Sequence, residues 1–138
     1  MVFTETFSLT TKGFCDIIDI TGKVAAAAGR SRLANGIVAA FCPGSTCSIT
    51  TIEYESGVLR DLARVIEEIV PQKATYEHDR RWGDGNGFSH VRAALLKPSI
   101  TVPLLRGKLA LGTWQQIVFL DFDNRERRRE IIVQVVGE

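Results

Sequence analysis

Hydrophobic and polar residues alternate at the start of the chain, where Phe3, Phe7 and Leu9 share one side of residues 2–10 and hydroxyl residues occupy the other. This period of two predicts a β-strand with one apolar face. Short apolar or β-branched runs between turn residues predict further strands. We place them at residues 14–19, 37–42, 48–54, 100–105, 108–111, 116–122 and 130–136.

Two segments predict helices. Residues 57–70 carry an apolar stripe at helical spacing and end at Pro71. An alanine-rich helix is expected over residues 22–32, with Thr21 as its N-cap. The polar stretch 72–90 predicts a long functional or mobile loop. We therefore predict one α+β domain, residues 1–138, built mainly of antiparallel β-sheet with two main helices.

Composition excludes several classes of protein. The 138 residues are 45% hydrophobic, and 17 basic against 16 acidic residues leave a net charge of +1. With so small a net charge, the protein as a whole has no electrostatic field that would attract nucleic acid or an anionic membrane, although a local basic patch stays possible. The nearly uncharged run 33–52 contains Pro43 and several hydroxyls, so it does not predict a spanning helix. With no export signal at the start, and with three cysteines that read as free thiols, a cytoplasmic protein is expected.

The first candidate site lies in residues 43–53. A glycine followed by two hydroxyl residues, as in Gly44-Ser45-Thr46, can present backbone N–H groups and hydroxyls to an anion. The lysine of a nucleotide-binding P-loop is absent. The competing interpretation is that these hydroxyls simply favour strand and turn.

The second candidate site lies in residues 82–92, where alternating glycines allow a ligand to approach the backbone. Asp84, Asn86, His90 and Arg92 bring four polar functions into this short segment. A calcium loop would need a glutamate that is missing here. An ordinary surface loop remains the alternative.

The third candidate segment contains Trp114 and Gln115 and leads into the strand that ends near Asp121. The following arginines, residues 125–129, form either a phosphate site or a solvated ion-pair turn. Trp114 has an alternative role as a core residue. The cysteines and two histidines lack the spacing of a strong metal motif.

Taken in order, these motifs resemble the YjbQ family over nearly the whole chain. They are Gly44 to Glu53, Tyr76-Glu77-His78, Gly83 to Asn86, His90, Leu111 to Gln115 and Phe122-Asp123. The resemblance implies a small α+β domain built on antiparallel sheet and forming a homotrimer. Family members are named secondary thiamine-phosphate synthases, because some join a pyrimidine diphosphate to a thiazole phosphate.

The chain departs from the common family pattern at two positions. Gly44 and Phe88 stand where that pattern has histidines able to hold a metal. The ligand set for zinc or another divalent ion is then incomplete. We predict no stoichiometric zinc and no cofactor; the alternative is a divalent metal held by ligands drawn from His78, His90, Cys47 and nearby carboxylates.

The resemblance implies a pocket for a phosphorylated small molecule. Ser45 and Thr46 are expected to hold phosphate, and Glu53 with His90 to position the substrate or move a proton. Asn86 is expected to orient the ligand. Trp114 and Gln115 would close the pocket from the same or a neighbouring subunit. The alternative is a non-catalytic protein that binds a metabolite or a partner without turnover.

Overall fold

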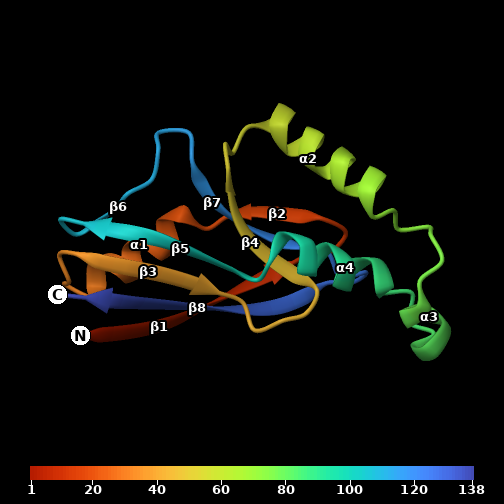
Figure 1. Ribbon diagram of the computed structural model, residues 1–138, viewed down its shortest axis with the longest axis horizontal. Coiled ribbons are helices and arrows are strands. Elements are labelled where there is room, and N and C mark those ends of the chain that lie inside the picture. Colours follow the sequence, from red (N-terminus) through yellow and green to blue (C-terminus); the bar gives the residue numbers. More distant parts are fainter.

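The computed structural model describes residues 1–138 and consists of two antiparallel sheets that share a hydrophobic core (Figure 1). The larger sheet has the strand order β1-β8-β3-β5-β6, and the smaller has the order β2-β7-β4. The strands are β1 Val2–Thr11, β2 Asp16–Asp19, β3 Gly36–Phe41, β4 Cys47–Ile52, β5 Ser99–Leu105, β6 Lys108–Leu109, β7 Gln116–Asp121 and β8 Arg127–Gly137. The predicted α+β class and antiparallel pairing are confirmed.

Four helices accompany the sheets, whereas the sequence predicted two. They are α1 Thr21–Arg30, α2 Ser56–Ile69, α3 Glu77–Trp82 and α4 Gly87–Leu96. The helices α3 and α4 replace most of the predicted loop. Gly83 and Gly85 adopt left-handed φ values of 69° and 65°, so they break the chain between two short helices rather than extending a loop. None of the helices is long and apolar enough to cross a membrane.

The start of α1 differs from the prediction, because Ile20 rather than Thr21 occupies the N-cap position. The Thr21 hydroxyl donates to Asp19 Oδ1 at 2.7 Å and accepts from the Ile117 backbone N–H at 2.8 Å. Thr21 is therefore used to fasten α1 to β7 and is not free to cap the helix.

The central strand β7 is buried on both faces. Ile117 and Phe119 lie in the core between the sheets, and Val118 and Leu120 lie in a second cluster with Ile66 of α2 and α4's Ala93. This double cover fixes the end of β7 at Asp121, next to the candidate site.

Arg92 links α4 to the end of α2 from a buried position. Its guanidinium donates to the Val70 carbonyl at 3.0 and 2.8 Å and to Glu67 at 2.5 Å. The same group lies 5.0 Å from the centre of the Phe88 ring. Arg92, which the sequence offered as a possible ligand-binding residue, is thus committed to holding two helices together.

Candidate functional site

A buried network of ion pairs forms where β4 begins and β7 ends. Arg129 of β8 donates to both carboxylate oxygens of Asp121, at 2.8 and 3.0 Å, and to the Thr46 hydroxyl at 2.6 Å. The Thr46 hydroxyl donates to Asp123 at 3.0 Å. Thr46 and Asp121 are both buried. The hydroxyl predicted to hold phosphate is therefore bonded to a carboxylate and a guanidinium within the chain.

Two further side chains complete what we call the Arg129–Asp121 network. Thr11 donates to Asp121 at 2.6 Å, and Arg127 donates to Asp123 at 2.9 Å. Burial raises the pKa of Asp123, but hydrogen bonds from Thr46 and Arg127 outweigh burial and hold that pKa below its usual range. Burial alone would lower the pKa of Arg129, but its hydrogen bond to Asp121 raises it. Both groups therefore stay ionised near neutral pH.

A cavity of about 280 Å³ lies between the loop after β3 and helix α4. The loop contributes Gly44 and Ser45, Cys47 opens β4, and α4 contributes His90 with residues one turn further along. The volume is near the lower end of the range for small-molecule sites. The structure thus brings together Ser45 and His90, which the sequence offered from two separate motifs. We call this space the Ser45–His90 cavity.

His78 stands beside this cavity, because its ring centre lies 4.5 Å from that of His90. Its Nδ1 atom is buried without a hydrogen-bond partner. That atom lies 3.6 Å from Asp79 Oδ1 and 3.4 Å from Asp84 Oδ1. Ligand atoms of His78, Asp79 and Asp84 all fall within 4.8 Å of one another, a donor set suited to a divalent ion.

Sequence reasoning offered His78 only as an alternative metal ligand and did not place it among the predicted site residues. The available signal was its position in the Tyr76-Glu77-His78 motif, but a prediction needed the fold of α3 against α4, which brings two rings twelve positions apart into contact.

Phe88 does not face this cavity, although the family pattern suggested a lost imidazole at that position. It is buried and packs on Arg92, 5.0 Å from the guanidinium. Two positions along a helix correspond to a rotation of about 200°, so Phe88 and His90 point to different sides of α4. The imidazole that accompanies His90 is instead that of His78.

Asn86 is buried directly before α4 and serves the local fold. Its side-chain oxygen and its backbone carbonyl both accept from the Ser89 hydroxyl, the latter at 2.7 Å. Within the chain, this side chain is engaged with its own helix and is not among the residues that line the Ser45–His90 cavity.

Glu53 and Trp114 line a different cavity, of about 450 Å³, at the far end of β4. Gln115 lies beside it and donates to Thr51 at 3.3 Å. Six residues of strand, about 20 Å, separate Cys47 from Glu53. Within one chain Glu53 and His90 therefore do not share a cavity, and Trp114 does not close the space beside His90.

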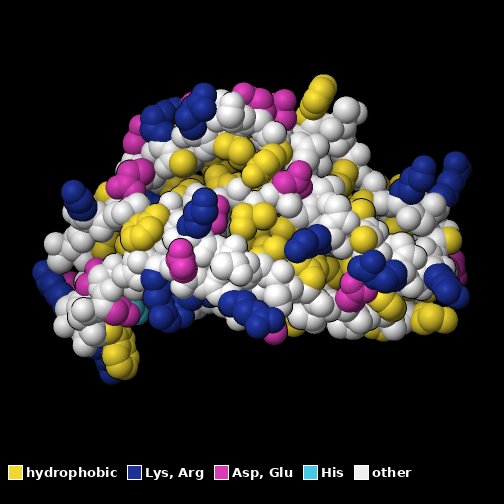
Figure 2. Space-filling view, turned by 180° about the vertical axis from the view of Figure 1, so that it is seen from behind, with side chains coloured by type: hydrophobic (Ala, Val, Ile, Leu, Met, Phe, Trp, Pro, Cys, Tyr) yellow, Lys and Arg dark blue, Asp and Glu magenta, His cyan; other side chains and the backbone are white.

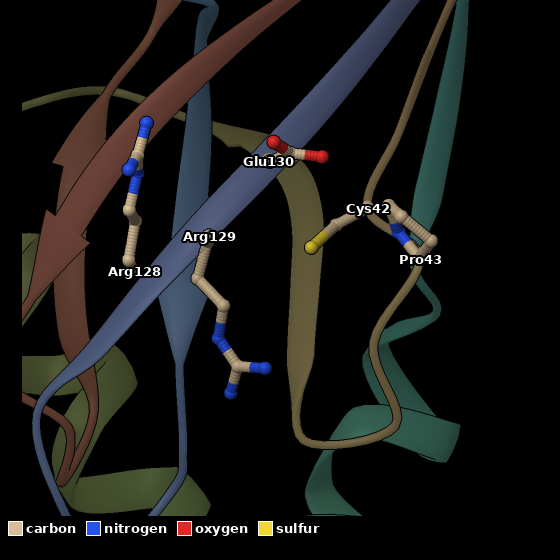
Figure 3. Close-up of a pocket in the computed structure, with 5 residues that line it drawn as sticks. All are labelled: Cys42, Pro43, Arg128, Arg129 and Glu130. Carbon is tan, nitrogen blue, oxygen red and sulfur yellow. The ribbon is translucent and has the colours of Figure 1, made fainter.

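The arginine-rich turn is divided between the two faces of β8. Figure 3 shows Arg128 and Glu130 pointing away from Arg129, as alternation along a strand requires. Together with Cys42 and Pro43 these side chains line a cavity of about 380 Å³. Arg127 and Arg129 of strand β8 form ion pairs with aspartates, but these aspartates are buried, so the segment is not the solvated ion-pair turn that the sequence offered as one of two interpretations.

Together, these features define a small α+β domain with two antiparallel sheets and a cavity at the start of β4 that contains Ser45 and His90. The model of the family described as "UPF0047 protein YjbQ-like" matches residues 5–138, and the chain belongs to this family. It is 42% identical over 125 residues to a UPF0047 protein of Archaeoglobus fulgidus, covering 91% of this chain and 95% of that one. A UPF0047 protein of Methanothermobacter thermautotrophicus is 40% identical over 137 residues, covering 99% and 94%.

Solved structures share the whole fold. A YbjQ-like protein of unknown function from Sulfolobus solfataricus superposes with a TM-score of 0.94 at 30% identity, covering 100% of this chain and 99% of that one. A YjbQ/UPF0047 family protein from Clostridium acetobutylicum gives a TM-score of 0.87 at 33% identity, covering 96% and 99%. These similarities establish the family and the fold.

Proposed function

We propose that this protein binds a phosphorylated small molecule in the Ser45–His90 cavity. The observation that carries the proposal is the meeting of Ser45 and His90 around one space. A hydroxyl and an imidazole can both donate hydrogen bonds to phosphate oxygens. The chemistry that we propose there is the one implied by the family resemblance, in which a thiazole nitrogen displaces pyrophosphate from a pyrimidine diphosphate in the cytoplasm.

The residues around the cavity suit that chemistry. Departure of pyrophosphate needs positioning and stabilisation of negative charge more than covalent help. Ser45 would hold a phosphate oxygen, and His90, supported by the ring of His78, would donate a proton to the leaving group. A divalent ion on His78, Asp79 and Asp84 would neutralise charge on the departing pyrophosphate.

We further propose that the protein is a homotrimer in which Glu53, Trp114 and Gln115 of one subunit approach the Ser45–His90 cavity of the next. Trp114 is 71% exposed, whereas tryptophan is highly buried on average, so it offers apolar surface to a neighbouring subunit. Hydrophobic side chains also gather below α2, with charged side chains along its outer edge (Figure 2). Only Ile66 of that helix is buried, although it carries an amphipathic stripe, so a second copy has apolar surface to cover.

The binding proposal is tested by titrating the protein with inorganic pyrophosphate in a calorimeter. Ser45→Ala and His90→Ala should each weaken binding about tenfold or more, since each removes one hydrogen bond to a charged ligand. Thr10→Ala is the matched control, because it removes an exposed hydroxyl on β1. Pyrophosphate affinity that is unchanged in both site variants would contradict the proposal.

The transfer reaction is tested by pyrophosphate release from the two phosphorylated precursors. Loss of the imidazole in His90→Ala should slow release by about 10²-fold or more if it acts as a general acid. Binding of pyrophosphate without any release by the unaltered protein would favour the non-catalytic alternative.

For the trimer, light scattering gives the mass in solution. Mixing His90→Ala with Glu53→Ala should then restore release, because mixed trimers would contain intact sites.

A further inference from the structure

Two of the three cysteines form a close pair at the edge of the candidate site. Cys42 follows β3 and Cys47 opens β4, and the short loop between them brings their Sγ atoms to 3.0 Å. Both are free thiols. Cys42 and Cys47 are 2% and 0% exposed, but each lines a cavity, Cys42 beside Arg128 and Arg129 and Cys47 beside Ser45 and His90. The pair therefore lies between two spaces that a small molecule can enter.

A guanidinium stands against this pair. A Cβ atom added to Gly44 would lie 3.0 Å from Cys47 Sγ and 3.1 Å from Arg129 Nη1, so that glycine fills the narrow gap between thiol and guanidinium. Figure 3 shows the Cys42 sulfur directed toward the side of β8 that carries Arg129. The hydrogen bond between the two thiols lowers the pKa of Cys47, and the charge of Arg129 lowers it further. The same hydrogen bond raises the pKa of Cys42.

We propose that Cys42 and Cys47 form a redox-active dithiol that a small hydroperoxide oxidises to an intramolecular disulfide. Their sulfurs need to approach by only about 1 Å to reach the bond length of about 2.05 Å. The distance of 3.0 Å between the two Sγ atoms suits a disulfide better than a metal site, because two thiolates on one zinc ion would lie about 3.7 Å apart. Burial with access only through small cavities favours a compact oxidant over a bulky disulfide.

The reaction has two balanced steps. The Cys47 thiolate attacks one peroxide oxygen, the O–O bond breaks, and a proton from solvent gives one alcohol, or water when the oxidant is hydrogen peroxide, with sulfenic acid on Cys47. The Cys42 sulfur then attacks Cys47 Sγ and displaces the hydroxyl group, which takes up the Cys42 proton and leaves as water. Two electrons pass from the sulfurs to the peroxide. A dithiol reductant reverses the change.

Cys15 provides an internal control within the same molecule. Its thiol is not part of the pair, and burial raises its pKa. Digestion with trypsin places the pair and Cys15 in different peptides. Residues 33–60 form one peptide that contains both Cys42 and Cys47, and residues 13–23 form another that contains Cys15. The experiment exposes the folded chain to a low concentration of hydrogen peroxide, then unfolds and alkylates it. After digestion with trypsin, mass spectrometry gives the masses of both peptides.

The expected result is a peptide 33–60 that is two hydrogens lighter and unalkylated, formed at least about tenfold faster than any modification of Cys15. Dithiothreitol should restore both alkylation sites. In Cys42→Ala, a sulfenic acid should persist on Cys47 and react with dimedone, and in Cys47→Ala the remaining Cys42 should stay alkylatable. The proposal is overturned if the unaltered chain keeps both thiols, or if Cys15 reacts as fast as the pair. None of these readouts depends on phosphate binding.

Discussion

Replacing Asp121 by alanine should destabilise the protein severely. The carboxylate of Asp121 is fully buried and accepts two hydrogen bonds from Arg129 and one from the Thr11 hydroxyl. It also accepts from the backbone N–H of Asp123 at 3.0 Å. Asp121→Ala removes all four bonds and leaves the Arg129 guanidinium, 12% exposed, without its main counter-charge.

The size of this loss of stability follows from the unpaired charge left on Arg129. Removing one partner of a buried ion pair costs about 3–5 kcal/mol, because the other partner remains desolvated. For 138 residues, an unfolding entropy of about 2.1 cal/mol/K per residue gives about 290 cal/mol/K in all. The melting temperature of Asp121→Ala should therefore fall by about 10–17 °C.

Urea unfolding followed by circular dichroism measures the free energy, and a thermal melt measures the shift in temperature. The double variant Asp121→Ala with Arg129→Met should be more stable than Asp121→Ala alone, because no unpaired charge is left. Arg30→Met is the control, since it breaks an exposed ion pair with Glu5 and should change little. A small loss of stability in Asp121→Ala, or strictly additive losses in the double variant, would contradict the predicted coupling between Asp121 and Arg129.

Three other predictions concern substitutions of Arg92, Asp123 and Gly44. Arg92→Ala should cost about 1–3 kcal/mol in urea unfolding, because the buried Val70 carbonyl loses its hydrogen-bond donor. Asp123 has a lowered folded pKa, so its contribution is present above about pH 4 and lost as pH falls through that pKa. Asp123→Asn should therefore show a shallower acid-induced loss of stability in melts below pH about 4. Gly44→Ala should cost about 1–3 kcal/mol through crowding, and adding Cys47→Ala should recover part of it in the same assay; simple additivity would argue against that contact.

The sheets were predictable because strand patterns are local. Alternation over residues 2–10 and the apolar runs that follow matched the observed strands to within a few residues. The helix α4 was not predictable in the same way. Phe88, Ser89 and Arg92 are buried on it, but Val91 and Leu95 are exposed, so no clean apolar stripe marks the sequence. The three glycines that precede or begin it, Gly83, Gly85 and Gly87, then favoured a loop.

The candidate site was predictable only in part. Ser45 was selected because a hydroxyl can hold phosphate, and His90 because an imidazole can position the substrate or move a proton; the fold brings both to one cavity. Pairing Glu53 with His90 in one chain overlooked the length of β4. A strand from residue 48 to 54 was predicted, and its own length separates Glu53 from the start of the segment by about 17 Å. The Cys42–Cys47 contact depends on the path of a turn, which spacing alone does not specify.

The two ends of β4 differ in a way that bears on where chemistry takes place. At the first end, Asp121 and Asp123 are buried and bonded to arginines that join the smaller sheet to β8, so the neighbouring loop is held in one geometry. At the other end, Glu53 and Trp114 are exposed side chains around an open cavity. A binding site gains affinity and rate from groups that are fixed before the ligand arrives. Under the proposed function, the buried end would therefore supply the site itself, and the exposed end would be the surface that a second subunit has to order before Glu53 could contribute.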